Sequence, residues 1–163
     1  MKQQKLKEVK KKVQEEWGFR VVGEDLDKPW GAYFVIHPED TVKFVETYFS
    51  DHKEKFQTAG DLSPKYLIVE GGKRLSWQVH ERRGEIWKVV EGTVGAFTSE
   101  TDEHPQEHIH LEVDEVLYMD KGVRHRLVGL DDWGVVAEIW VHTDAKNLSD
   151  EDDIRRVADD FNR

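Results

Sequence analysis

The second half of the chain is divided into short apolar segments, and this division is the feature that most constrains the fold. From residue 65 onward, runs rich in Val, Ile, Leu and aromatic residues are separated by turns of Gly, Asp and charged residues. The segments are KYLIVEGG, RLSWQVH, EIWKVVEGTVGAF, HIHLEVDEVLYM, RHRLVGL and WGVVAEIWVH. Several short strands at near-regular spacing are typical of an antiparallel sandwich or barrel. We therefore predict that this half is mainly β.

The first part of the chain has helical periodicity, and we expect it to cover the barrel. Apolar residues spaced by three and four predict an amphipathic helix over residues 3–17 and another over residues 37–56, with Pro38 in its first turn. Between them, KPWGAYFVI (residues 28–36) predicts a turn that leads into a strand. The Lys-rich face of the first helix would suit a membrane surface, but its apolar stripe is thin, which favours a solvent-exposed face.

The tail NLSDEDDIRRVADDFNR predicts a short helix capped by Ser149 or Asp150. The sequence contains no internal repeat and no linker. A chain of 163 residues is expected to form one domain.

The charge and the absence of cysteine narrow the classes of ligand. A formal net charge of −10 argues against nucleic acid or an anionic membrane as the main partner. With no Cys, disulfides and thiolate ligands are excluded, so any metal must be held by His, carboxylate or amide groups. The sequence begins without an apolar h-region and has no run approaching the about 20 apolar residues of a membrane span. We expect a cytoplasmic protein.

The stretch LSWQVHERRGEIW combines an apolar strand face with groups that can bind a metal. In a strand, Leu75, Trp77 and Val79 share one face, while Gln78 and His80 share the other. If the polar pair points into a barrel, the apolar residues face outward. They would then pack against another layer or a dimer partner.

Two further side chains complete a candidate ligand set. A turn after His80 would aim Glu85 at the same point, and DKGVRHRL offers His125 from a distant strand. Gln, His, Glu and His suit a divalent Zn, Mn, Co or Fe ion, with positions left open for a substrate. The alternative is structural, because a single His on a strand is usually not a ligand.

These motifs resemble a known family. GGKRLSWQVHERRGEIWKVVEGTV and DKGVRHRL resemble the two cupin motifs of type II mannose-6-phosphate isomerases, and KPWGAY and LSDEDDIRRVADDFNR resemble motifs that flank them. The resemblance spans residues 28–36 and 65–163, so the segment 38–58 would be an insertion. It implies a single-domain cupin, a double-stranded β-helix or jelly-roll barrel over residues 65–163. Residues 1–64 would form an extension packing on this barrel.

The resemblance also implies an activity and a cofactor. One divalent metal ion, with Zn as first choice, would be held by Gln78, His80, Glu85 and His125. The reaction would be aldose–ketose isomerisation of a sugar phosphate, most simply mannose 6-phosphate to fructose 6-phosphate. The family often carries this cupin behind a nucleotidyltransferase domain, for which this chain has no room and no Gly-rich signature. We expect isomerase chemistry without guanylyl transfer, in a homodimer.

Two residues are expected to meet the substrate. Arg83 lies two residues before Glu85 and matches the family's Arg between the His and Glu ligands, which is linked to isomerase activity. Since Arg keeps its charge, its catalytic role would be to stabilise an enediolate or phosphate; the alternative is a surface turn residue. Trp87 shares the face of Glu85 and is the candidate substrate-binding aromatic residue. The base stays open between a metal-bound water and a Lys or Glu from another strand.

Departures from the family motifs leave the sugar open. Asp120 replaces the usual Pro of the second motif, and residues 140–142 read WVH where the family has E-V-Q. Arg126 is expected to point away from the site and to pair with acidic residues of the tail. The cations available for a phosphate are Arg74, Arg126, Arg155, Arg156 and Lys28.

A second group of His residues lies outside the candidate ligand set, and the motifs also fit several rival functions. HPQEHIH supplies His104, His108 and His110, but alternation with Ile109 and Leu111 predicts that these His face solvent. The rival functions are a free-sugar isomerase acting on mannose or lyxose, a nucleotide-sugar epimerase that would not need the metal, and a non-catalytic sugar-binding cupin.

Overall fold

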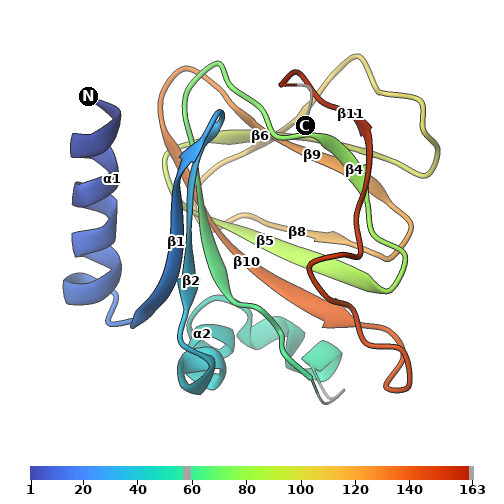
Figure 1. Ribbon diagram of the computed structural model, residues 1–163, viewed down its shortest axis with the longest axis horizontal. Coiled ribbons are helices and arrows are strands. Elements are labelled where there is room, and N and C mark those ends of the chain that lie inside the picture. Colours follow the sequence, from blue (N-terminus) through green and yellow to red (C-terminus); the bar gives the residue numbers. More distant parts are fainter. Residues whose placement is uncertain (57–59, 162–163) are drawn as a thin grey trace.

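Two antiparallel β-sheets that face each other form the body of the protein, in a computed structural model that describes residues 1–56 and 60–161 (Figure 1). In spatial order, the larger sheet contains β1 (Val21–Lys28), β2 (Gly31–Ile36), β3 (Lys65–Val69), β10 (Gly134–His142), β5 (Arg83–Glu91) and β8 (Val116–Met119). The smaller sheet contains β11 (Arg155–Ala158), β4 (Trp77–Val79), β9 (Arg124–Gly129), β6 (Val94–Ser99) and β7 (Ile109–Leu111). Mainly β architecture is therefore confirmed.

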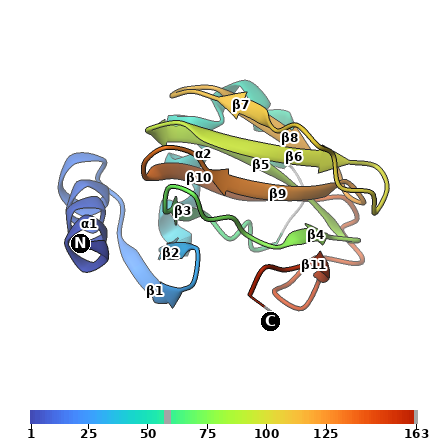
Figure 2. The same ribbon diagram turned by 90° about the horizontal axis from the view of Figure 1, so that it is seen from above.

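The predicted N-terminal helix is present and lies beside β1 (Figure 2). It consists of α1 (Lys2–Lys11) and one π-helical turn (Lys12–Glu16). Its apolar stripe, Leu6, Val9 and Val13, is buried in the core. None of the helices in the described residues is long and apolar enough to cross a membrane.

The second predicted helix is broken into three pieces. A 3₁₀ turn (Pro38–Asp40) leads into α2 (Thr41–Tyr48), and a 3₁₀ segment (Ser50–Phe56) follows. The helix ends at Phe49, whose φ of −131° is not helical. Val42, expected in the apolar stripe, is 69% exposed, whereas Phe44 is fully buried. The two lie about 200° apart around a helix, so only one of them can face the core.

The hairpin of β1 and β2 extends the larger sheet, because β2 pairs along β3. The sequence predicted β2 but not β1, whose Glu and Asp residues do not read as a strand. It forms because its backbone pairs with β2 at the sheet edge. The boundary between an extension at residues 1–64 and a barrel at residues 65–163 stays a prediction, as does the insertion at 38–58, whose last two residues lie outside the described ranges.

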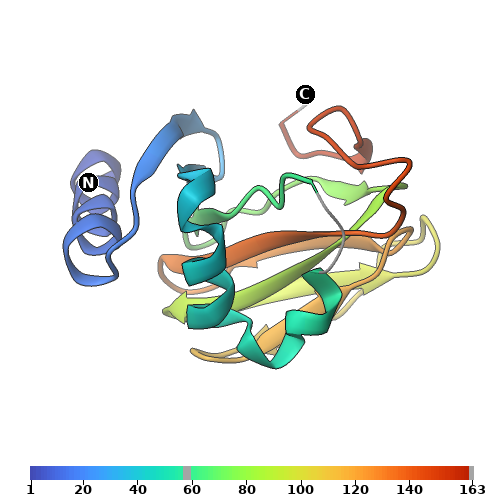
Figure 3. The same ribbon diagram turned by 90° about the horizontal axis from the view of Figure 1, so that it is seen from below.

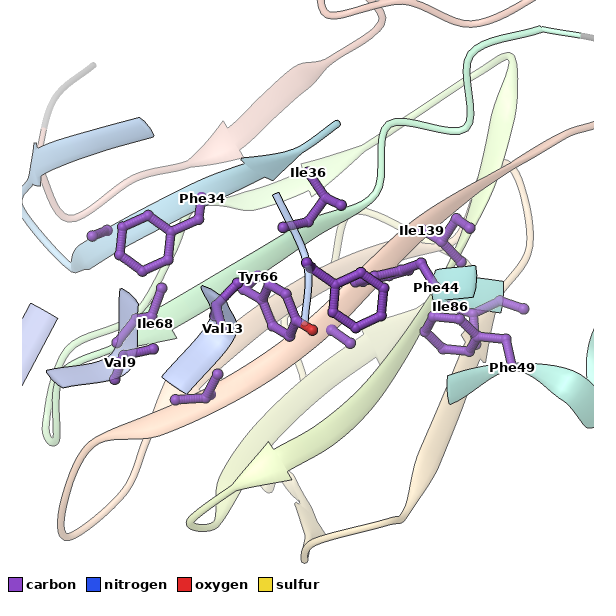
Figure 4. Close-up of a cluster of buried hydrophobic side chains, with 14 of the residues drawn as sticks. Val9, Val13, Phe34, Ile36, Phe44, Phe49, Tyr66, Ile68, Ile86 and Ile139 are labelled. Carbon is purple, nitrogen blue, oxygen red and sulfur yellow. The ribbon is translucent and has the colours of Figure 1, made fainter. Parts of the chain in front are cut away.

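The larger sheet is buried on both faces. On β3, Tyr66 and Ile68 pack against the helices, while Leu67 and Val69 face the space between the sheets. Figure 4 shows the outer cluster, where α1 and α2 cover the sheet. Phe44 lies in its centre, with ring centroids 5.4 Å from both Phe19 and Tyr66. In Figure 3 α2 lies across this outer face.

The outward apolar face of β4 is covered by a loop of the same chain. Trp77 donates its Nε1–H to the carbonyl oxygen of Asp102, and its ring lies 4.8 Å from that of His104. Val79 is fully buried on the same face. Leu75 departs from the predicted alternation, because the strand begins only at Trp77 and Leu75 turns toward the space between the sheets.

The tail forms a strand, so the prediction of a short helix there is wrong over the described residues up to 161. After a turn at Asp150–Asp153, β11 pairs antiparallel with β4 at the edge of the smaller sheet (Figure 1). The free edge of β4 offers backbone hydrogen bonds that a short exposed helix would not gain. The last two residues of the motif, 162–163, lie outside the described residues.

The packing of α2 can be tested by core truncation. Phe44→Ala is expected to lower the free energy of unfolding by about 3–5 kcal/mol, because it removes a fully buried ring. Val42→Ala on the same helix is the control and should change it by no more than about 0.5 kcal/mol. Urea denaturation measures both, and a loss below about 1 kcal/mol for Phe44→Ala would contradict this packing.

Candidate metal centre

Four side chains predicted as ligands meet between the two sheets. Gln78 on β4 lies opposite His125 on β9, His80 follows β4, and Glu85 comes from β5 of the other sheet. One ligand atom from each of His80, Glu85 and His125 lies within 4.8 Å of the others. His125 Nε2 is 3.1 Å from Glu85 Oε1, and His80 Nε2 is 3.4 Å from Glu85 Oε2. Each of the three side chains is only 2% exposed.

The backbone orients both imidazoles toward the carboxylate. His80 Nδ1 lies 2.6 Å from the carbonyl oxygen of Asp153, and His125 Nδ1 lies 3.1 Å from that of Val123. A carbonyl oxygen can only accept, so Nδ1 carries the proton in each ring. In the neutral rings, both Nε2 lone pairs then point at Glu85.

This arrangement fits a divalent cation. Glu85 Oε1 is buried and accepts no hydrogen bond from the described residues. Carboxylate oxygens and imidazole lone pairs that converge in a buried space repel one another unless a proton or a cation lies between them. Two neutral His and one carboxylate are also a ligand set common for Zn²⁺ and other divalent ions. The His80, Glu85 and His125 cluster can therefore hold a metal.

The charges of the cluster are strongly coupled. Burial alone would raise the pKa of Glu85, but His80, His125 and Arg83 hold that pKa well below its ordinary value. Burial alone would lower the pKa of His80, but the Glu85 carboxylate raises it. Glu85 is thus an anion that attracts any cation able to enter.

Gln78 lies at the rim of this cluster. Its Nε2 is 3.4 Å from His125 Nε2, and its Oε1 accepts a hydrogen bond of 2.8 Å from the Ser76 hydroxyl. Ligation through Oε1 would require the amide to turn over. Ser76 permits this, because a hydroxyl can accept from Nε2 as well as donate to Oε1.

Arg83 is buried against the cluster, so the surface-turn alternative is wrong. The side chain is 6% exposed, and its Nε donates to Glu85 Oε2 over 3.0 Å. Nη1 donates to Ser149 Oγ and to the carbonyl oxygen of Asp150, each over 2.9 Å. The guanidinium also stacks 3.9 Å from the ring centroid of Trp140. Arg83 therefore joins Glu85 to the tail.

A second buried carboxyl group, Glu138 on β10, was not identified from the sequence. It lines the same cavity as Gln78, His80 and Glu85, and it is 7% exposed. Burial, followed by the charge of Glu85, raises the pKa of Glu138 to about 7. The signal for it was one acidic residue within the otherwise apolar run GVVAEIWVH.

Trp87 holds this carboxyl group. It is 1% exposed and donates its Nε1–H to Glu138 Oε2 over 2.8 Å, and its ring lies edge-on to His125. It packs in the core between the sheets. A direct contact of Trp87 with a substrate stays a prediction.

The C-terminal tail is hydrogen-bonded to residues that border the site. The carboxylate of Asp153 accepts hydrogen bonds from the backbone N–H groups of Glu81 and Arg82 and from the hydroxyl of Ser149. The backbone carbonyl oxygen of Asp153 accepts a hydrogen bond from Nδ1 of His80. The motif LSDEDDI therefore orients both a candidate ligand and Arg83.

The side chain of Arg126 lies where the sequence predicted it. It points away from the cluster, donates to the carbonyl oxygen of Ala158 and lies 3.9 Å from the carboxylate of Asp160.

The second group of His residues agrees only in part with the prediction. His108 and His110 are exposed as predicted, but His104 is half-buried between Trp77 and Phe97. The apolar alternation was also wrong, since Ile109 is 41% exposed.

Comparison with known proteins identifies the class and then the family. Among solved structures, the capsular polysaccharide assembling protein CapF from Staphylococcus aureus has a TM-score of 0.59 at 15% identity, covering 86% of this chain and 32% of that one. KdgF from Halomonas sp. has a TM-score of 0.52 at 14% identity, covering 76% and 91%. At such identities these likenesses establish the fold alone, a mainly β cupin barrel with added helices, as predicted.

The match of the sequence to a family model shows which family the chain belongs to. A family model described as mannose-6-phosphate isomerase C-terminal matches residues 51–159, so the chain belongs to this family of sugar-phosphate isomerase-like cupins. Two curated relatives, the xanthan biosynthesis protein XanB of two Xanthomonas campestris pv. campestris strains, are each 29% identical over 136 residues. The match covers 83% of this chain but only 23% of the length of each relative.

The attachment of the tail gives a prediction about stability. Asp153→Ala would leave the part-buried N–H groups of Glu81 and Arg82 and the buried hydroxyl of Ser149 without an acceptor, which is expected to cost about 1–3 kcal/mol. Asp152→Ala, at an exposed neighbouring position, is the control and should change stability by no more than about 0.5 kcal/mol. Chemical denaturation of both variants tests this, and equal stabilities would show that the carboxylate of Asp153 does not fasten the tail.

Proposed function

We propose that this protein is a metal-dependent aldose–ketose isomerase of a sugar phosphate, with mannose 6-phosphate and fructose 6-phosphate as the first pair to test. One observation carries the proposal. Gln78, His80 and Glu85 line one cavity of about 170 Å³ together with Arg83 and the buried carboxyl group of Glu138, and His125 lies directly behind Glu85. Membership of the mannose-6-phosphate isomerase family supports the reaction type.

The proposed metal ligands are Gln78, His80, Glu85 and His125, with Zn²⁺ as the first candidate. When bound, the ion supplies Lewis-acid stabilisation of the negative charge that develops on the substrate oxygens. Only Glu85 of these four ligands is an anion, so a divalent ion keeps a net positive charge. The backbone contacts of both His rings hold their Nε2 atoms in place for ligation.

Arg83 is proposed as a catalytic residue that acts by its fixed charge. Its Nη2 lies 3.4 Å from His80 Nε2, at the inner wall of the cavity. A guanidinium does not release its proton at working pH, so it cannot be the base. It stabilises the negative charge of the enediolate and at the same time holds Glu85 in place.

Glu138 is proposed as the group that moves the proton. It accepts the hydrogen of C2 as a proton, the C–H electron pair forms the C1=C2 double bond, and the π pair of the C1 carbonyl moves to the C1 oxygen, which gives the enediolate. It then returns the proton to C1, while the proton of the C2 hydroxyl passes to the C1 oxygen. Trp87 orients Glu138 for this role by its hydrogen bond. One carboxyl group can serve both carbons because they are adjacent.

The homodimer and the cytoplasmic location expected from the sequence stay predictions. Light scattering on the purified protein measures whether it is a homodimer.

Assays of the purified protein with mannose and lyxose, as well as with mannose 6-phosphate, distinguish a free-sugar isomerase from a sugar-phosphate isomerase. Metal and sugar binding without turnover would instead indicate a non-catalytic cupin.

Metal content and activity should separate His80 from Arg83. His80→Ala is expected to lose both bound metal and activity, because a ligand is removed. Arg83→Ala is expected to keep the metal and to lose about 10²–10³-fold in kcat, as for other fixed charge-stabilising donors. Elemental analysis and an assay that couples fructose 6-phosphate formation measure the two effects.

The control for Arg83 is its neighbour Arg82, which is not part of the cavity wall and pairs with Asp150. Arg82→Ala should retain metal and turnover. Unchanged turnover in Arg83→Ala would remove the role assigned to that residue. A wild-type protein that binds no divalent ion would overturn the proposed function itself.

Replacement of Glu138 tests the proton transfer. Glu138→Gln keeps the size of the side chain and an oxygen for Trp87, so folding and metal content should be retained. Turnover should fall by about 10²–10⁴-fold, the usual contribution of a general base. Exchange of the C2 hydrogen with solvent, followed by NMR, should be lost together with turnover. Exchange and turnover at wild-type rates would assign the proton transfer elsewhere.

A further inference from the structure

Besides Arg83, three cationic side chains line the cavity that contains Gln78, His80 and Glu85. They are Lys28 at the end of β1, Lys65 on β3 and Arg156 on β11. The family model begins at residue 51, so it does not include Lys28. These cations come from three distant parts of the chain, and the proposed isomerase mechanism uses none of them.

Arg156 faces the cavity because of its register in the smaller sheet. It lies opposite Gln78 in the β11–β4 pair, and residues opposite each other in an antiparallel pair project from the same face. Its side chain is exposed, and within residues 1–56 and 60–161 no carboxylate pairs with it. The adjacent Arg155 lies opposite Val79, projects from the other face and pairs with Asp102 over 3.0 Å.

Both lysines lie near Tyr33 in the wall of the same cavity. The Nζ atoms of Lys28 and Lys65 each lie 5.8 Å from the ring centroid of Tyr33. Each has an ion pair, Lys28 with Asp25 over 3.4 Å and Lys65 with Glu151 over 3.0 Å. Lys28 and Asp25 are both partly exposed, so their pair contributes little and an incoming anion can replace it at small cost. Lys65 is only 11% exposed, but the carboxylate of Glu151 is 71% exposed and lies mostly in solvent.

The cavity therefore contains groups of both signs. The carboxyl groups of Glu85 and Glu138 are buried, and Lys65 lies opposite Glu138 in the β10–β3 pair. The guanidinium of Arg156 and the ammonium group of Lys28 line the same cavity, with aromatic surface from Trp30 and Tyr33. Arg binds a phosphate through two parallel N–H donors, and Lys adds point charges.

We propose that Arg156, assisted by Lys28 and Lys65, binds the phosphate monoester of the substrate and so holds the reacting carbons of its sugar chain at the metal-ligand cluster. This assignment rests on the proposed isomerase function, because it places the other end of the same substrate. Arg156 is then the residue that makes the site select a phosphorylated sugar over a free one.

Binding of an unreactive pair of ligands tests the assignment. Sorbitol 6-phosphate and sorbitol have no carbonyl group and cannot be isomerised, so binding is measured without turnover. By calorimetry on the protein with its bound metal, the phosphate ester should bind at least about 10-fold more tightly than sorbitol. Arg156→Gln should weaken binding of the phosphate ester by about 10- to 100-fold and leave binding of sorbitol within about twofold. Lys28→Gln should have a smaller effect in the same direction.

Arg155→Gln is the matched control, because it removes the same charge from the adjacent position on the opposite face of the sheet. It should bind both ligands as the wild type does. Equal affinities of Arg156→Gln and Arg155→Gln for sorbitol 6-phosphate would overturn the assignment, even if the wild type isomerises a sugar phosphate. A wild type that binds the phosphate ester no better than sorbitol would overturn it as well. If phosphate-dependent binding requires Arg156 while no isomerase activity exists, the assignment stands and the proposed function fails.

Discussion

The buried charge of Glu85 is the constraint on which the rest of the site depends. A carboxylate that is 2% exposed is stable as an anion only if cations or donors surround it. Arg83 from the same strand supplies a fixed positive charge, while His80 from the end of β4 and His125 from β9 approach Glu85 from the other sheet, so a proton or a metal ion held among them would tie the two sheets together. The tail then fixes two of these partners, since Asp153 meets His80 and Ser149 meets Arg83.

The position of the site at one end of the barrel follows from the pairing of β5 with β10. Along β5 the residues that face inward change from polar to apolar, from Arg83 and Glu85 to Val89. The inner face of β10 changes in the same direction, with Glu138 near the polar end and Val136 near the apolar end. The outer faces of both strands are covered by helices. The apolar end thus supplies packing, and the polar end forms a cavity.

The cluster of His80, Glu85 and His125 could be predicted because alternation on a strand places Gln78 and His80 on one face, and because the two motifs that carry the cluster resemble those of the family. The partners of Arg126 in the tail were also predicted correctly. Glu138 could not be identified in this way, because one acid in an apolar strand has no recognisable spacing. The strand β11 was missed for a related reason: its pairing with β4 depends on an edge that exists only in the folded chain.

By itself, the sequence determined the mainly β fold class, the family and the side chains that can hold a metal, since these depend on periodicity and on short motifs. Only the tertiary structure decided that Arg156 on β11 faces the cavity, that Arg83 is buried against Glu85, and that Glu138 lies in the same cavity. The physical reason is that charge compensation and cavity lining depend on contacts between residues far apart in the chain. Such contacts follow from strand register, because a shift of one residue would move every side chain of a strand to the other face.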